Sequence, residues 1–130
     1  MDDTTRQNYT GEGGLAKATL TLPEQNNTEN TKYGIISGSN SYRHTWVLLK
    51  NKYGIHARPS AKIVELAKQY AQCEIWAEKG SVKIDAKDIM AWMTLGVPFG
   101  SEVRLIAKGK GCVEVLEKMV VLFDSKFNEE

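Results

Sequence analysis

The spacing of apolar residues changes several times from Thr45 onward, and this alternation limits the folds open to the chain. Residues 46–49 form a short apolar run followed by polar residues, which is typical of a strand. The next apolar residues follow the i, i+3, i+4, i+7 spacing of an amphipathic helix. These residues are Ile63, Leu66, Ala67 and Tyr70. The chain is therefore expected to mix strands and helices.

The remaining pattern completes a strand, helix, strand, strand, helix, strand, helix order. Strands are expected at 75–77, 82–86 and 103–107, a short helix after Asp88, and a long helix whose apolar stripe runs from Cys112 to Phe127. Asp88 is a good N-cap for the short helix. This order predicts an α+β fold, an open-faced β-sandwich. A four-stranded antiparallel sheet would carry three helices on one face and leave its other face to water.

The chain divides by composition near residue 44. Residues 1–44 are rich in Asn, Thr, Gly and Ser and poor in large apolar side chains, so they are expected to be a flexible, low-complexity N-terminal extension. Within them, 38–41 is typical of a linker. Two short exceptions, 18–22 and 33–36, are candidates for addition to a sheet edge. Residues 45–130 are expected to form the folded domain.

Composition excludes several classes of function. The 130 residues carry 17 basic and 16 acidic side chains, for a net charge of +1, so no basic face suited to nucleic acid is expected. No apolar run is long enough to span a membrane. The polar, acidic start of the chain is unlike a signal peptide, so the cytoplasm is the expected location. Cys73 and Cys112 are then expected to be free thiols.

Residues 54–59, Gly-Ile-His-Ala-Arg-Pro, place His56 immediately before the first predicted helix. A neutral imidazole is nucleophilic near pH 7, and a helix start offers backbone N–H groups to an anion. If His56 is the N-cap, Ala57 and Arg58 contribute such groups, while Pro59 loses none that matters. Arg58 adds a guanidinium that fits phosphate oxygens. The motif predicts a phosphohistidine site. The alternative is a plain polar helix cap.

Two further expectations surround this site. Gly54 can approach it closely and adopt torsions that other residues avoid, so it is grouped with Ala57 and Arg58 as phosphate-binding. His44, the only other histidine, stands before the first predicted strand without a motif and is expected at the surface. No spacing of ligands supports a metal site, and no cofactor is expected.

Residues 54–59 resemble the active-site signature of the HPr family, the bacterial histidine phosphocarriers of the phosphoenolpyruvate-dependent sugar phosphotransferase system. The resemblance runs from about 45 to 127 and includes blocks at 47–53, 86–90 and 93–96. It implies that His56 takes a phosphoryl group on Nδ1 from Enzyme I and passes it to sugar-specific EIIA-type components. Such a protein is a relay without turnover of its own. The alternative is a regulatory HPr-like protein in carbon or nitrogen control.

The resemblance also bears on the short helix after Asp88. It implies that Ile89, Met90 and Met93, with Ala57, form a surface that docks partners, whereas the alternative for these residues is core packing. Trp92 is expected to point inward. Many members of the family carry a regulatory serine where this chain has Asp88. The aspartate is interpreted as a helix cap or, alternatively, as a partial mimic of phosphoserine.

Overall fold

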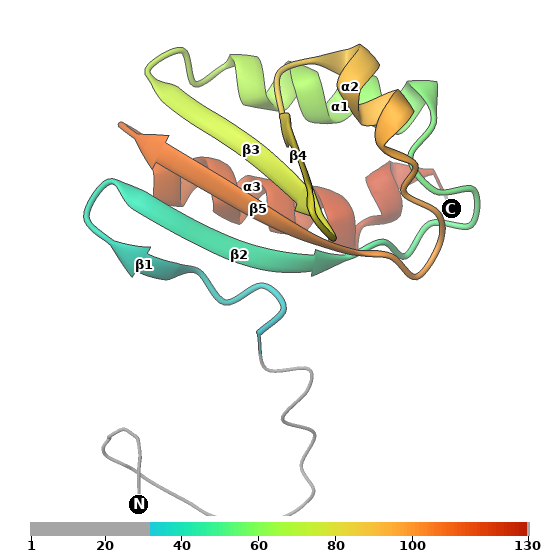
Figure 1. Ribbon diagram of the computed structural model, residues 1–130, viewed down its shortest axis with the longest axis horizontal. Helices are drawn as coiled ribbons and strands as arrows, with labels where there is room; N and C mark the ends of the chain where they lie inside the picture. Colours follow the sequence, from blue (N-terminus) through green and yellow to red (C-terminus); the bar gives the residue numbers. More distant parts are fainter. Residues whose placement is uncertain (1–31, 130) are drawn as a thin grey trace, which may run out of the picture. The chain divides into compact units, whose positions relative to one another are not determined.

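Five antiparallel strands form one sheet in residues 32–129, the part of the chain that this computed structural model describes (Figure 1). The strand order across the sheet is β1-β2-β5-β3-β4. Each pair of neighbouring strands is antiparallel. In chain order the elements are β1 (Ser37–Ser39), β2 (Tyr42–Leu48), α1 (Ala57–Lys68), β3 (Cys73–Lys79), β4 (Val82–Asp85), α2 (Ile89–Leu95), β5 (Glu102–Gly109), α3 (Cys112–Asp124) and a 3₁₀ turn, η3 (Lys126–Asn128).

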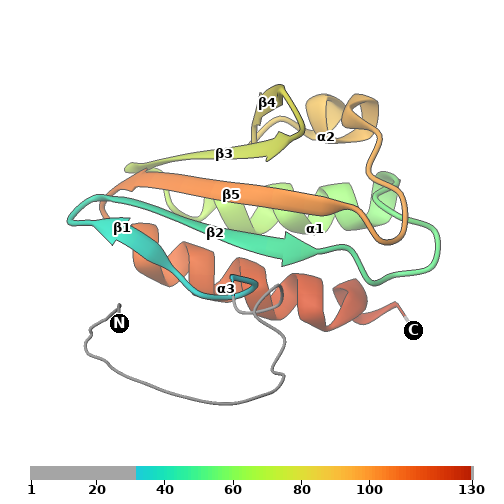
Figure 2. The same cartoon turned by 60° about the horizontal axis from the view of Figure 1, so that its bottom comes forward.

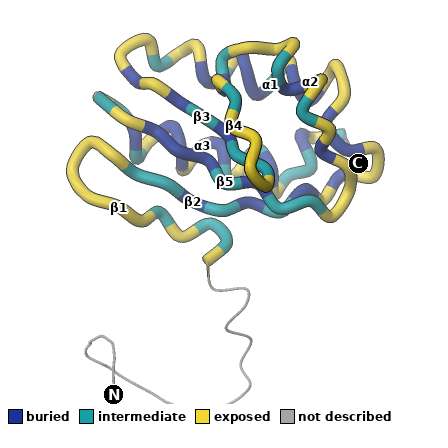
Figure 3. Tube along the Cα trace, viewed as in Figure 1, coloured by how far each residue is buried: buried dark blue, intermediate teal, exposed yellow. Residues whose placement is uncertain are grey.

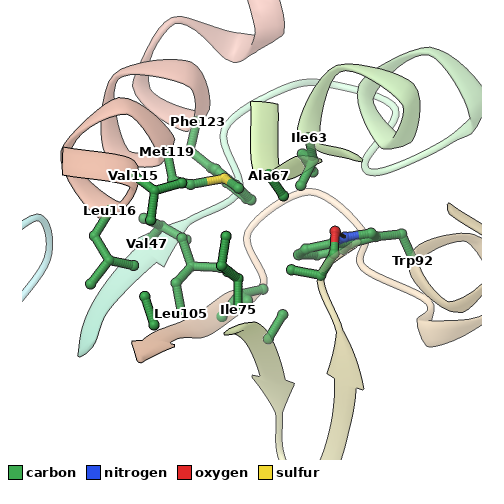
Figure 4. Packing of buried hydrophobic residues seen from close by; sticks show 14 of the residues in the cluster. Val47, Ile63, Ala67, Ile75, Trp92, Leu105, Val115, Leu116, Met119 and Phe123 are labelled. Atoms are coloured by element: carbon green, nitrogen blue, oxygen red, sulfur yellow. Dashed lines mark hydrogen bonds between the residues drawn. The ribbon is translucent and has the colours of Figure 1, made fainter. Parts of the chain in front are cut away.

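The helices lie on one side of the sheet, which confirms the predicted α+β open-faced sandwich (Figure 2). Alternate residues of each strand point toward the helices, so β2, β3 and β5 contribute buried apolar side chains to the same layer. Figure 4 shows this layer between sheet and helices, and Figure 3 shows how burial concentrates there. Its labelled members are Val47, Ile63, Ala67, Ile75, Trp92, Leu105, Val115, Leu116, Met119 and Phe123.

The predicted linker at 38–41 is instead part of a hairpin, so the sheet has five strands where four were expected. Ser37 pairs with His44 and Ser39 with Tyr42, leaving Asn40 and Ser41 as a two-residue turn. Asn40 has a φ of 52°, a left-handed conformation that asparagine tolerates well. The small polar residues that look like a linker are the residues that a tight hairpin requires.

The first strand of the predicted domain starts earlier than residue 45, because β2 begins at Tyr42. The predicted boundary after residue 44 therefore falls inside a strand. The expectation that 33–36 adds to a sheet edge is met at Tyr33, which forms an isolated parallel bridge with Trp46. The Gly34 amide also donates to the Trp46 carbonyl at 2.9 Å. The other candidate, 18–22, lies outside the described residues.

The long helix predicted to reach Phe127 ends at Asp124 in the structure. Lys126, Phe127 and Asn128 all have φ values near 57–59°, so the backbone leaves the α-helical conformation. Phe127 is nevertheless fully buried, with its ring 4.9 Å from that of Phe123. The apolar stripe thus continues through a turn that folds back onto the core, and periodicity alone does not distinguish these two backbones.

The outward face of the sheet carries charged and aromatic side chains together. The Arg104 guanidinium lies 3.2 Å from Glu78 Oε1, Lys83 Nζ lies 4.9 Å from the ring centre of Trp76, and the Ile106 side chain between the strands is only 1% exposed. We call this surface, with Trp46 and its neighbours on β2, the open sheet face. None of the helices in residues 32–129 has the length and apolar character needed to cross a bilayer.

Candidate functional site

The turn before α1 is held by one buried amide side chain. Asn51 Nδ2 donates to the Gly54 carbonyl at 2.6 Å, and the Gly54 amide donates back to the Asn51 carbonyl at 3.2 Å. Gly54 has a φ of +74°, and a Cβ at this position would lie 2.5 Å from the Val97 carbonyl oxygen. Glycine is therefore required both by the torsion and by the close approach of the Val97 backbone. The adjacent Ile55 amide also bonds the Val97 carbonyl, at 2.9 Å.

His56 is the N-cap of α1, as the sequence predicts, and its backbone is extended. Its carbonyl accepts the first helical hydrogen bond, from the Ser60 amide at 3.0 Å. The ring makes no capping hydrogen bond and its side chain is 43% exposed, so the alternative of a plain polar cap finds no support in its contacts. Its Nε2 lies 3.2 Å from Glu129 Oε2.

The start of α1 offers the anion-binding features that the motif predicts. Within the helix, the N–H groups of Ala57 and Arg58 precede the first intrahelical donor, and Pro59 is buried in the first turn, where its missing N–H costs little. No acidic residue occupies the first turn of α1. The positive end of the helix dipole is therefore not offset from within the helix. Gly54, which was grouped with these residues, uses its own N–H on Asn51.

An open depression of about 610 Å³ brings the site residues together. Three of its lining residues, His56, Ala57 and Arg58, belong to the sequence motif. The other three are Lys52, Tyr53 and Glu129, which sequence reasoning missed. Lys52 and Tyr53 are next to the motif and could have been noticed there. Nothing in the sequence points to Glu129, because the turn at Lys126–Asn128 is what brings it to the histidine.

The side chains predicted to dock partners are exposed on α2. The exposed fractions of Ile89, Met90 and Met93 are 38%, 62% and 43%, so the alternative of core packing is wrong for them. Trp92 is fully buried, as expected, and its Nε1 donates to the Ala86 carbonyl at 3.0 Å. Phe99 and Tyr53 are also exposed, by 66% and 74%, and were not anticipated. We call Ile89, Met90, Met93, Ala57, Tyr53 and Phe99 the apolar surface.

Asp88 caps α2, which confirms the first of its two interpretations. Its Oδ1 accepts a hydrogen bond from the Ala91 amide at 3.1 Å, and its backbone is extended as an N-cap requires. The helix ends at Gly96 in a left-handed conformation. The Asp88 side chain is therefore engaged with its own helix, and its negative charge lies at the end of the helix that carries the apolar surface.

His44 meets the expectation of a surface position only in part. It lies within β2 and is half-buried, and its Nδ1 accepts a long hydrogen bond from Arg104 Nε at 3.4 Å. Burial, followed by the charge of Arg104, holds the pKa of His44 below its ordinary value. Cys73 and Cys112 are buried free thiols, and burial raises the pKa of Cys73. Across residues 32–129, no cluster of three His, Cys, Asp or Glu side chains has the arrangement to hold a metal ion.

Comparison with known proteins agrees with this fold. The HPr family model, described as the PTS HPr component phosphorylation site, matches residues 44–125. The phosphocarrier protein HPr of Treponema pallidum is 36% identical over 84 residues, which span 65% of this chain and 94% of that protein. The HPr-like protein Crh of Bacillus subtilis is 41% identical over 73 residues, or 56% of this chain and 85% of that protein.

A solved structure of an HPr protein has the same fold. The crystal structure of HPr-C-His from Thermoanaerobacter tengcongensis superposes with a TM-score of 0.64 at 42% identity, covering 67% of this chain and 97% of that one. The protein therefore has the fold and the histidine motif of the phosphocarriers. The chain belongs to the HPr family of the phosphotransferase system.

Proposed function

We propose that His56 accepts a phosphoryl group from Enzyme I and passes it to sugar-specific EIIA-type components in the cytoplasm. One observation carries the proposal. The imidazole stands exposed at the first turn of α1, with no capping bond to its own helix, in the same depression as Arg58. In a histidine that served only to cap the helix, a ring nitrogen would accept a hydrogen bond from a backbone N–H of the first turn.

The chemistry that this proposal requires is modest. A lone pair of the imidazole forms a bond to phosphorus while the bond from phosphorus to the donor breaks and the donor keeps that electron pair. Such transfers depend mainly on positioning and on stabilising the charge of the phosphoryl oxygens. The guanidinium of Arg58 and the N–H groups at the start of α1 are suited to those oxygens. The same few contacts leave the group transferable to the next protein.

The apolar surface supports the docking half of the proposal. Met90 and Met93 are flexible and exposed, and α2 packs beside α1, the helix that begins at the histidine. Methionine-rich surfaces adapt to several partners, which suits a relay that must meet a donor and an acceptor in turn.

A regulatory role is the second candidate, and two observations favour it. The chain is 41% identical over 73 residues to the HPr-like protein Crh, and it carries a negatively charged side chain at Asp88. Under this proposal Asp88 imitates a phosphoserine and weakens docking to Enzyme I. Asp88→Ser and Asp88→Asn both remain good caps. If transfer rates from Enzyme I rise equally in both variants, the charge acts as a mimic; if both match the parent, this candidate fails.

Onward transfer separates the carrier from the regulator. The protein is first incubated with phosphoenolpyruvate and Enzyme I, then freed of both and mixed with a panel of EIIA-type components. The carrier proposal predicts an acid-labile phosphate that leaves the protein and appears on at least one component within the mixing time. Phosphate that forms but stays on the protein with every component would support regulation instead. Lys118→Ala, on α3, serves as the matched surface control.

A further inference from the structure

The carboxylate of Glu129 faces the histidine from the end of the described chain. Its Oε2 lies 3.2 Å from His56 Nε2, and its side chain is only 10% exposed, compared with 43% for His56. Glu129 lies outside the part of the chain that the family model matches, residues 44–125. The family match therefore does not itself assign this contact.

One side-chain contact and one backbone hydrogen bond help to hold Glu129 in place. Its second oxygen, Oε1, accepts from Asn51 Nδ2 at 3.4 Å, and the same Nδ2 donates to the Gly54 carbonyl. Asn51 is fully buried, so Glu129 is tied to the turn that presents the histidine. The Glu129 amide also donates to the Lys126 carbonyl at 3.1 Å.

The backbone before Glu129 is anchored as well. Phe127 is fully buried against Phe123, and its carbonyl accepts a hydrogen bond from Lys62 Nζ on α1. The left-handed turn at Lys126–Asn128 is thus held at two points, the side chain and the carbonyl of Phe127. A carboxylate placed by such a turn has little freedom to swing away from the imidazole.

An ionised carboxylate only accepts hydrogen bonds, so it favours the neutral imidazole that carries its proton on Nε2. In that form the lone pair resides on Nδ1, and the Nε2–H points to Glu129 Oε2, 3.2 Å away. We infer that Glu129 is a positioning residue that reserves Nδ1 of His56 for the phosphoryl group. This inference rests on the proposed function. Arg58 lines the same depression as His56, and its guanidinium suits the oxygens of a phosphoryl group.

The choice of nitrogen can be tested without any protein partner. Potassium phosphoramidate phosphorylates histidine directly: an imidazole lone pair forms the new bond to phosphorus, the phosphorus–nitrogen bond of the reagent breaks, and ammonia leaves with its electron pair. The ³¹P NMR spectrum then distinguishes the Nδ1 isomer from the Nε2 isomer. The proteins to compare are the parent, E129A and E129Q, with E117Q on the exposed side of α3 as the matched control.

The parent and E117Q are expected to carry phosphate on Nδ1. In E129A the proportion of the Nε2 isomer should rise about tenfold, as expected for the loss of one hydrogen bond to a charged group. E129Q keeps an acceptor oxygen without the charge and should lie between them. An isomer ratio in E129A equal to that of the parent overturns the inference, as does a parent labelled mainly on Nε2.

A second measurement needs no phosphorylation. The ¹⁵N shifts of the His56 ring report which nitrogen carries the proton, and E129A should move population from the Nε2–H form to the Nδ1–H form. Unchanged shifts in a folded E129A, checked by its thermal unfolding, would mean that Glu129 only fills the depression. Failure of Enzyme I to charge a parent that shows the expected isomer and shifts would sink the proposed function and leave the role of Glu129 standing.

Discussion

Two surfaces of this protein, the open sheet face and the apolar surface, carry large apolar side chains. They differ in whether charged groups of the same chain cover those side chains. On the open sheet face, each tryptophan is covered by a cation of the same chain. Lys32 Nζ lies 4.3 Å from the ring centre of Trp46, and Lys83 Nζ lies 4.9 Å from that of Trp76. On the apolar surface, Met90 and Met93 remain 62% and 43% exposed.

The open sheet face also carries paired charges. Glu102, on the open sheet face, accepts from Lys32 at 2.6 Å and from the Tyr33 hydroxyl at 3.1 Å, and these bonds hold the pKa of its carboxyl below the ordinary value. Arg104 and Glu78 neutralise each other on the neighbouring strands. A surface whose polar and charged groups pair with one another contributes to folding. An exposed apolar surface that includes Ala57, next to His56, is suited to binding a partner. Substitutions should therefore affect stability on one face and transfer on the other.

The most severe test of this division is Trp92→Ala. Trp92 anchors α2 to the core, because its side chain is fully buried and its Nε1 donates to the Ala86 carbonyl. Its loss should lower the free energy of unfolding by about 3–5 kcal/mol and loosen the helix that presents the apolar surface. Chemical denaturation measures the first effect and the rate of charging by Enzyme I the second. A stable variant that still charges at the parent's rate would show that α2 is not needed for docking.

Arg58→Ala should leave the fold intact and slow charging. Arg58 is exposed at the start of α1, so its removal opens no cavity. A charged donor to the transferring group is worth on the order of 10²-fold in rate. Stopped-flow or quench-flow charging by Enzyme I gives the number, with Lys68→Ala, at the far end of α1, as the control. Equal rates for the two variants would contradict the role given to Arg58.

The paired substitutions Met90→Ala with Met93→Ala, and Trp76→Ala alone, compare the two surfaces directly. The methionine pair should weaken docking to Enzyme I about tenfold, because two exposed anchors of an interface are lost, with little change in stability. Trp76→Ala should do the reverse, since it uncovers Ile106 without touching the site. Docking affinity and thermal unfolding are measured on all variants. If Trp76→Ala weakens docking as strongly as the methionine pair, the comparison of the faces is wrong.

Asp88→Ala should cost about 1 kcal/mol of stability, because the Ala91 amide loses its cap. Asp88→Asn keeps the cap and should cost much less. Denaturation curves of the two variants give the difference. Equal losses in both would mean that the charge, rather than the hydrogen bond, provides the stabilisation.

The smallest effect concerns pH and the open sheet face. Because the folded state holds the pKa of His44 below the ordinary value of about 6.5, the unfolded chain binds a proton more readily. Protonation of His44 therefore costs nothing well above that pH and reduces stability as pH falls below it. Arg104 and Glu78 are the charged groups that act on His44. His44→Gln should flatten this part of the curve of stability against pH, and its charging by Enzyme I should match the parent's. An unchanged slope would contradict the prediction.

The sequence predicts local structure well where a few neighbouring residues determine it. The N-caps at His56 and Asp88 and the inward Trp92 are all found, because caps and apolar periods depend on a few neighbouring residues. The strand β1 was missed, since three small polar residues give no apolar alternation. Phe127 was assigned to a helix because its burial fits the stripe, although its backbone is left-handed.

The site was predicted only in part, because some of its residues are neighbours in sequence and others are not. His56, Ala57 and Arg58 are adjacent in sequence and share one depression. Glu129 reaches that depression only through the turn at Lys126–Asn128, and His44 is half-buried only because β2 pairs with β5. Contacts made by tertiary packing leave no periodic signal in the sequence, so they required coordinates.

The most direct test of the account is the mass of the intact protein after incubation with phosphoenolpyruvate and Enzyme I. We expect the parent to gain one phosphoryl group that acid removes, with the modification mapped to His56 and absent from His56→Ala. A parent that gains none under conditions that charge an HPr phosphocarrier, or a His56→Ala variant that still gains one, would contradict the central claim.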